Sequence, residues 1–217
     1  MKTGTQLQHD VLAELEWQPS IEASKIGVTA KDGVVTLTGS VASYADKTTA
    51  ERVAKRVYGV KAVANDVEVK IPGSSQRGDT DIATAALNAL KWDTTIPEDR
   101  IKITVRNGWI TLEGTVDWWY QKEAAERVVR NLSGVTGLTS QITVKSRAKP
   151  GEVKSKIEAA FKRSAEMDAR RVGVEAHDGK VILHGNVHSW TEKEEAEQAA
   201  WAAPGVSEVE NRITVTP

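Results

Sequence analysis

Hydrophobic and polar residues alternate along three short stretches of the chain, and each stretch follows the same pattern. Two apolar residues one position apart precede Asp-Gly or Asn-Gly, and an apolar-x-Leu-x-Gly-x-Val run follows. Period-two alternation is typical of a half-buried strand, and Asp-Gly or Asn-Gly between two such runs favours a two-residue hairpin turn. The turn glycines, Gly33, Gly108 and Gly179, lie 75 and 71 residues apart. Self-similarity at this period indicates three tandem units.

Apolar residues with helical spacing flank each hairpin, and a short closing strand ends each unit. The stripes before the hairpins are Leu7, Val11 and Leu15; Ile82, Ala86 and Leu90; and Val153, Ile157 and Phe161. The stripes after them are Ala50, Val53, Ala54 and Val57; Ala125, Val128, Val129 and Leu132; and Ala196, Ala199 and Ala200. The sequence therefore predicts an α+β fold of three tandem αββαβ domains, at residues 1–73, 76–147 and 149–217. Each is expected to be a three-stranded sheet with two helices on one face.

The composition of this 217-residue chain argues against several classes of protein. It has no cysteine, which excludes disulfides, thiolate zinc sites and cysteine nucleophiles. Lys and Arg number 29 against 30 Asp and Glu, so no repeat has the basic surplus that nucleic-acid binding requires. The motifs of serine hydrolases, P-loop and dinucleotide-binding proteins and zinc metalloproteases are missing. We therefore predict no enzymatic activity, no cofactor and no metal.

The hydropathy pattern also bears on the expected location. No apolar run approaches the roughly 18 residues of a membrane span, so we expect no transmembrane segment. The first ten residues contain one lysine and no apolar run of the kind found in a signal peptide. The expected location is cytoplasmic, or periplasmic if a signal has been removed.

The repeated unit resembles a known family. An αββαβ unit built around Asp-Gly-x-Val-x-Leu-x-Gly-x-Val and closed by Asn-x-Val/Ile-x-Val is similar to the BON domain of bacterial osmotic-stress and nodulation-related proteins. The closing motif begins at Asn65 and Asn211, whereas Ser140 replaces the asparagine in the second copy. The resemblance implies a non-enzymatic module, proposed to associate with phospholipid surfaces and often found in osmotically induced periplasmic or outer-membrane proteins.

Seven tryptophans stand against one phenylalanine, and comparing the repeats separates their roles. Tyr44, Trp119 and Trp190 occupy equivalent positions at the start of the second helix, where we expect a recurrent aromatic side chain to seal the core. Trp17 and Trp92 end the first helices, and we expect a structural role for them as well.

Three aromatic residues of the second repeat are the candidate binding surface. Trp118 stands where the sister repeats have a serine able to cap the second helix, and Trp109 stands where they have Val34 and Lys180. Tyr120 is close by in sequence. We expect Trp109, Trp118 and Tyr120 to contact a ligand or partner, the alternative being that they pack against a neighbouring repeat.

The histidines of the third repeat are expected to lie on a solvated surface and not to bind a metal. His177, His184 and His188 gather in the third repeat, but His184 and His188 do not share a helix face as a zinc pair would. The chain is thus predicted to be a non-catalytic binding or scaffold protein of osmotic or envelope stress that associates with phospholipid. The alternatives are a cytosolic protein-interaction array and a small-ion module that binds potassium.

Overall fold

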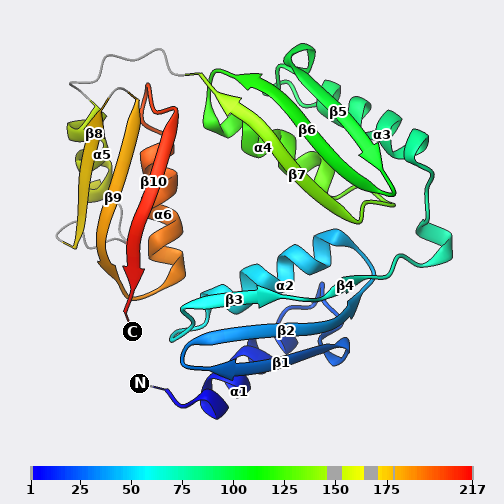
Figure 1. Cartoon of the computed structure of the whole chain (residues 1–217), viewed down its shortest axis with the longest axis horizontal. Coiled ribbons are helices and arrows are strands. Elements are labelled where there is room, and N and C mark those ends of the chain that lie inside the picture. Colours follow the sequence, from blue (N-terminus) through cyan, green and yellow to red (C-terminus); the bar gives the residue numbers. More distant parts are fainter. Residues whose placement is uncertain (1, 146–152, 164–170, 178, 217) are drawn as a thin grey trace.

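The computed structural model describes residues 2–145, 153–163, 171–177 and 179–216. Within them, helices and strands recur in the order helix, strand, strand, helix, strand, in three units that we call repeats 1, 2 and 3 (Figure 1). Each repeat has its own sheet. The predicted architecture of three tandem αββαβ domains is therefore confirmed.

The elements of the three repeats correspond one to one. Repeat 1 contains α1 (Gly4–Glu16), β1 (Ile26–Lys31), β2 (Val34–Val41), α2 (Tyr44–Arg56), β3 (Ala62–Asn65) and β4 (Glu68–Val69). Repeat 2 contains α3 (Asp79–Trp92), β5 (Ile101–Arg106), β6 (Trp109–Val116), α4 (Trp119–Arg130) and β7 (Gly137–Val144). Repeat 3 contains α5 (Val153–Arg163), β8 (Val172–His177), β9 (Lys180–Val187), α6 (Trp190–Trp201) and β10 (Glu208–Val215). Short 3₁₀ turns lie at Ala23–Lys25, Gly73–Ser75 and Glu98–Arg100.

The second strand of each hairpin is the central strand of its sheet. It pairs antiparallel with the first strand and parallel with the third, so that Leu37 faces Val28 on one side and Asn65 on the other. In repeat 1 the third strand is interrupted, and its two pieces, β3 and β4, both pair with β2. Because parallel neighbours need a crossover, the second helix returns the chain along the sheet before the third strand.

The hairpin turns have the backbone that their sequence predicts. Asp32 and Gly33 have φ of 53° and 86°, and Asn107 and Gly108 have φ of 52° and 75°. Two successive positive φ angles are typical of the type I′ turn, whose twist matches that of the flanking strands. In repeat 3 Gly179 has φ of 84°, whereas Asp178 lies outside the described residues.

One glycine in each central strand permits a close backbone contact. Gly39 has φ of 109°, and a Cβ atom placed there would collide with the carbonyl oxygen of Lys25. The same collision would occur between Gly114 and Arg100 and between Gly185 and Arg171. These contacts explain why glycine stands on an otherwise apolar strand face.

Each repeat has a separate hydrophobic core between its sheet and its two helices. In repeat 1 the buried stripe of α1, the buried stripe of α2 and the inward residues of β1 and β2 form one cluster. Repeats 2 and 3 have equivalent clusters. Both helices therefore cover the same sheet face, and the opposite face of each sheet is left uncovered by its own repeat.

The closing motif differs between the repeats in its hydrogen bonds. In repeat 1 the Asn65 side-chain amide donates to the Lys47 carbonyl oxygen (3.1 Å) and the Glu51 carboxylate (3.2 Å), and its oxygen accepts from the Val67 N–H. Asn211 makes the equivalent three bonds in repeat 3. In repeat 2 the Ser140 hydroxyl is buried without a hydrogen-bond partner. The substitution seen in the sequence thus leaves one helix–strand connection unmade.

The three repeats are arranged around a common centre, with the third strand and the second helix of each nearest to it (Figure 1). α2 and α6 pack directly against each other, which brings repeat 3 against repeat 1. None of the described helices has the length and apolar composition of a membrane-spanning segment.

Candidate functional site

Trp109 lies on the uncovered face of the repeat 2 sheet. Its ring packs over Gly137 on the neighbouring strand β7, where a side chain would collide with the indole. Its Nε1 donates to the Thr139 hydroxyl at 2.9 Å. Trp109 borders a shallow depression of about 490 Å³ whose other lining residues include Arg106 and Glu113. The indole is therefore fixed in orientation yet open to a ligand on its outer face.

Trp118 and Tyr120 lie at the beginning of α4. Trp118 occupies the N-cap position, where Ser43 and Ser189 cap α2 and α6 through their hydroxyls. In repeat 2 the equivalent N–H, that of Gln121, donates to the Trp118 carbonyl oxygen instead (3.2 Å), and the Gln121 side-chain oxygen accepts from the N–H of Asp117 (3.1 Å) and of Trp118 (3.0 Å). A backbone carbonyl thus satisfies the N–H that a capping serine would otherwise bond, and the Trp118 side chain is exposed.

All three candidate residues are exposed, but they do not form one patch. The exposed fractions of Trp109, Trp118 and Tyr120 are 49%, 42% and 52%. Trp109 begins β6, whereas the other two follow its end, and a strand of 8 residues spans about 23 Å. We call the surface around Trp109 the sheet surface, and the surface formed by Trp118 and Tyr120 the helix-start surface.

The equivalent aromatic residues of the second helices have a role that the sequence did not reveal. Tyr44 packs against the core of repeat 2, and Trp190 packs against the core of repeat 1. Trp119 stacks on Trp201 of repeat 3, with ring centroids 6.0 Å apart and an interplanar angle of 11°. We call Tyr44, Trp119 and Trp190 the docking aromatics. Our expectation that they seal their own cores is wrong, because each contacts the next repeat around the centre.

The surroundings of two docking aromatics show how these contacts are held. Burial at the junction raises the pKa of Tyr44, against the opposing influence of Arg130. The ring of Trp190 lies under two ammonium groups, at 5.5 Å from Lys55 of repeat 1 and 5.2 Å from Lys193 of its own helix. Cation–π contacts of this kind add to the apolar packing between repeats.

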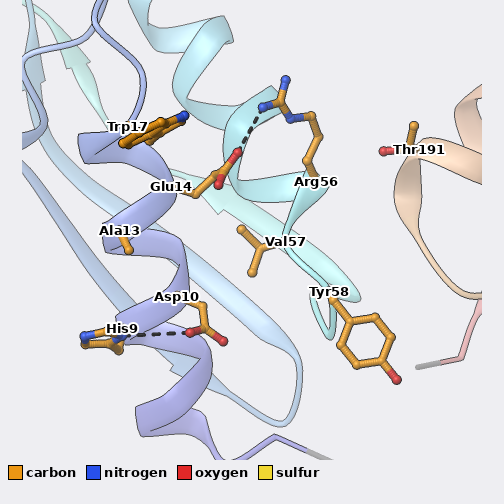
Figure 2. Close-up of a pocket in the computed structure, with 9 residues that line it drawn as sticks. All are labelled: His9, Asp10, Ala13, Glu14, Trp17, Arg56, Val57, Tyr58 and Thr191. Atoms are coloured by element: carbon orange, nitrogen blue, oxygen red, sulfur yellow. Dashed lines mark hydrogen bonds and ion pairs between the residues drawn. The ribbon is translucent and has the colours of Figure 1, made fainter.

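The tryptophans that end the first helices are also placed differently from the prediction. Trp17 and Trp92 are 84% and 85% exposed, so they do not seal the cores. Trp17 lies beside an open pocket of about 690 Å³ on repeat 1. Figure 2 shows it next to the ion pair between Glu14 and Arg56 (2.9 Å), with Thr191 of α6 on the opposite side. A helix-terminal tryptophan outside the buried stripe of Leu7, Val11 and Leu15 was the signal for this exposure.

The histidines of repeat 3 are exposed, as expected. His184 lies over Gly173 with its Nδ1 at 4.0 Å from a carboxylate oxygen of Glu175, and His188 contacts Arg171. No group of three metal-binding side chains occurs in the part of the chain that the structure describes. The same residues include no fully buried polar or charged side chain.

The fold and these surfaces define a tandem array of small α+β modules whose distinctive side chains are exposed aromatics. The profile of one family, described as "BON domain", matches residues 3–71, 78–146 and 151–217. The chain therefore belongs to the BON domain family, in three tandem copies.

Two further comparisons place the chain among known proteins. Osmotically-inducible protein Y of Escherichia coli K12 is 32% identical over 139 residues, which span 62% of this chain and 69% of the relative. A solved structure of CdsD, a structural protein of the type III secretion system of Chlamydia trachomatis, is 16% identical over 96% of this chain and 91% of its own. Its TM-score is only 0.28. A likeness at that level carries no argument about function.

Proposed function

We propose that the protein is a non-catalytic binding protein of the osmotic or envelope stress response that associates with phospholipid surfaces. The observation that carries the proposal is the exposure of large amphipathic aromatic residues in repeat 2, at Trp109, Trp118 and Tyr120. Tryptophan and tyrosine suit the boundary between lipid headgroups and acyl chains, because the ring is apolar while the N–H or O–H still reaches water. The osmotically inducible relative supports the link to stress.

The charge of the chain affects which lipids are expected to bind. The formal net charge is −1, so general attraction to anionic membranes is weak. Binding through aromatic side chains should accordingly depend little on salt, whereas binding through a basic patch would weaken steeply. The salt dependence of vesicle binding therefore distinguishes aromatic insertion from electrostatic adsorption.

Flotation of the full chain with vesicles tests the proposal. Vesicles of phosphatidylcholine alone and of phosphatidylcholine with phosphatidylglycerol should both carry the protein upward. Trp109→Ser and Trp118→Ser should each be made singly, because the sheet surface and the helix-start surface are separate, and then together. We expect the double variant to lose flotation while its circular dichroism stays unchanged, since exposed substitutions usually cost little stability.

The matched control is Trp17→Ser, which removes an equally large and more exposed indole from repeat 1. This variant should float as the parent does. A folded double variant that still floats would refute both proposed surfaces, and a double variant that unfolds would assign the two indoles to packing.

The same preparation tests the alternatives and the location. A cytosolic interaction array predicts no flotation, and a potassium module predicts a higher melting temperature in potassium than in sodium at equal ionic strength. The cytoplasmic location expected from the sequence remains a proposal. Separation of cells into cytoplasmic, periplasmic and membrane fractions tests it.

A further inference from the structure

A cavity lies where the three repeats meet. Its volume is about 530 Å³, and its lining comes from α2, from α4 and the residue that follows it, and from Glu194 of α6. Small-molecule sites typically have volumes of 300–1,000 Å³ and often form between domains. We call it the central cavity. Because no single repeat encloses it, it exists only when the repeats are docked on one another.

Basic side chains dominate the lining of the central cavity. α2 contributes Arg52 and Lys55, and α4 contributes Arg127 and Arg130, in each case two residues three positions apart on one helix face. The acidic lining residues are Glu51 and Glu194. The cavity therefore carries an excess of positive charge, although the chain as a whole is slightly negative.

The carboxylates that the structure describes leave part of this charge without a partner. Glu51 pairs with Lys55 at 2.8 Å, and Arg127 lies 4.0 Å from Asp93. Among the described residues, no carboxylate lies within ion-pair distance of Arg52 or Arg130. The Arg130 Nε atom is moreover buried without a hydrogen-bond partner. Burying a guanidinium nitrogen without an acceptor destabilises the folded protein, and an anion bound at this position would supply the missing acceptor.

A comparison of equivalent positions in the three repeats also favours an anion site. Arg52 and Arg127 are equivalent, as are Lys55 and Arg130, since each pair is separated by the 75-residue period. The equivalent residues of repeat 3 are the uncharged Gln198 and Trp201, and Trp201 is used to stack on Trp119. Two repeats thus direct the same basic pair toward one space, and their mutual repulsion destabilises the junction unless an anion neutralises it.

We propose that the central cavity binds an oxyanion of the phosphate class, held by Arg52 and Arg130 and completed by Arg127 and Lys55. Guanidinium groups suit this ligand because their planar N–H pairs match two oxygens of a phosphate at once. The hydroxyl groups of Tyr44 and Thr49, which also line the cavity, supply neutral donors. This site is separate from the sheet surface and the helix-start surface, which are proposed to bind lipid, and neither proposal depends on the other.

Thermal unfolding and titration calorimetry of the full chain with inorganic phosphate and with pyrophosphate, at constant ionic strength, test the site. A ligand that binds the docked repeats raises the melting temperature by mass action. We expect this rise in the parent, and an affinity at least tenfold lower in Arg52→Gln and in Arg130→Gln. Glu194→Gln, at an exposed position, should bind more tightly because it removes a negative charge from the cavity.

Arg163→Gln is the matched control, since Arg163 is an exposed arginine at the end of α5, outside the cavity. It should bind phosphate as the parent does. Vesicles containing phosphatidic acid distinguish the source of the phosphate. Binding of these vesicles that is lost in the arginine variants, without binding of soluble phosphate, would assign the oxyanion to a lipid headgroup.

Absence of any protection of the parent by phosphate, pyrophosphate or phosphatidic acid would overturn the proposal. An equal loss of binding in Arg163→Gln would overturn it too, because general charge would then explain the binding. The parent measurements decide the matter even where an arginine variant fails to fold.

Discussion

Replacing Ser140 with asparagine should stabilise repeat 2 by supplying the hydrogen bonds that its sister repeats make. The residues 75 positions after the three hydrogen-bond partners of Asn65 are Lys122, Glu126 and Ile142. The new side-chain amide should therefore bond to the Lys122 carbonyl oxygen, the Glu126 carboxylate and the Ile142 N–H. The buried Ser140 hydroxyl, which has no partner, would be removed at the same time.

The magnitude follows from the bonds gained and the freedom lost. A net intramolecular hydrogen bond contributes about 0.5–1.5 kcal/mol, and more when one partner is charged. Ordering the asparagine side chain opposes this by roughly 0.5–1 kcal/mol. We therefore expect Ser140→Asn to raise the free energy of unfolding of repeat 2 by about 1–2 kcal/mol. The reverse change, Asn211→Ser in repeat 3, should lower the stability of that repeat by about 1–3 kcal/mol.

Native-state hydrogen exchange followed by mass spectrometry is the suitable assay, because it reports on each repeat within the full chain. The slowest amides of β6 and β7 should become more protected in Ser140→Asn, and those of β9 and β10 less protected in Asn211→Ser. Adding Glu126→Gln to Ser140→Asn should cancel much of the gain. If repeat 2 gained nothing while Asn211→Ser destabilised repeat 3, the assumed equivalence of the two positions would be wrong.

Three further changes probe the turn, the junction and a carboxylate. Gly108→Val should destabilise repeat 2 by about 1–3 kcal/mol, measured by thermal unfolding, because it forces a β-branched residue to positive φ; Gly73→Ala, in open space, is the control. Trp190→Ala should leave the repeats folded but separate repeats 1 and 3, seen as a larger radius of gyration in X-ray scattering, whereas Trp17→Ala should not. Burial tends to raise the pKa of Glu51, but hydrogen bonds from Lys55 and Asn65 prevail and hold it below the ordinary 4.5. Its stabilisation of repeat 1 should be present above that value and lost as the pH falls through the lowered pKa, and Glu51→Gln should remove this pH dependence of unfolding.

The sequence predicted the structure correctly where the conformation depends on residues close together in the chain. The positive φ angles at Asp32 and Gly33, and the close approach at Gly39, follow from residue types whose backbone preferences are local. The stripes of the first helices were predicted correctly for the same reason, since all of their residues are buried. Periodicity reveals which face of an element is apolar, and each repeat builds one core from such faces.

The docking aromatics could not be assigned because periodicity does not say which apolar surface a residue meets. Tyr44 occupies the same place in its repeat whether it covers its own core or the next one. The distance between Trp109 and Trp118, in contrast, could have been predicted from the sequence, since the length of the intervening strand follows from its number of residues. The central cavity lay beyond the sequence altogether, because it depends on how three separately folded units meet.

The ring of docked repeats has a consequence for assembly. A linear array of repeats exposes at its two ends the surface by which neighbours stack, and solenoid proteins need capping repeats to cover it. Here Tyr44 of the first repeat contacts the second, Trp119 of the second contacts the third, and Trp190 of the third contacts the first. No repeat is terminal, so each of these stacking surfaces is already occupied within the chain. Three copies therefore form a self-limiting set that leaves none of these contacts free to recruit a fourth repeat or a second molecule.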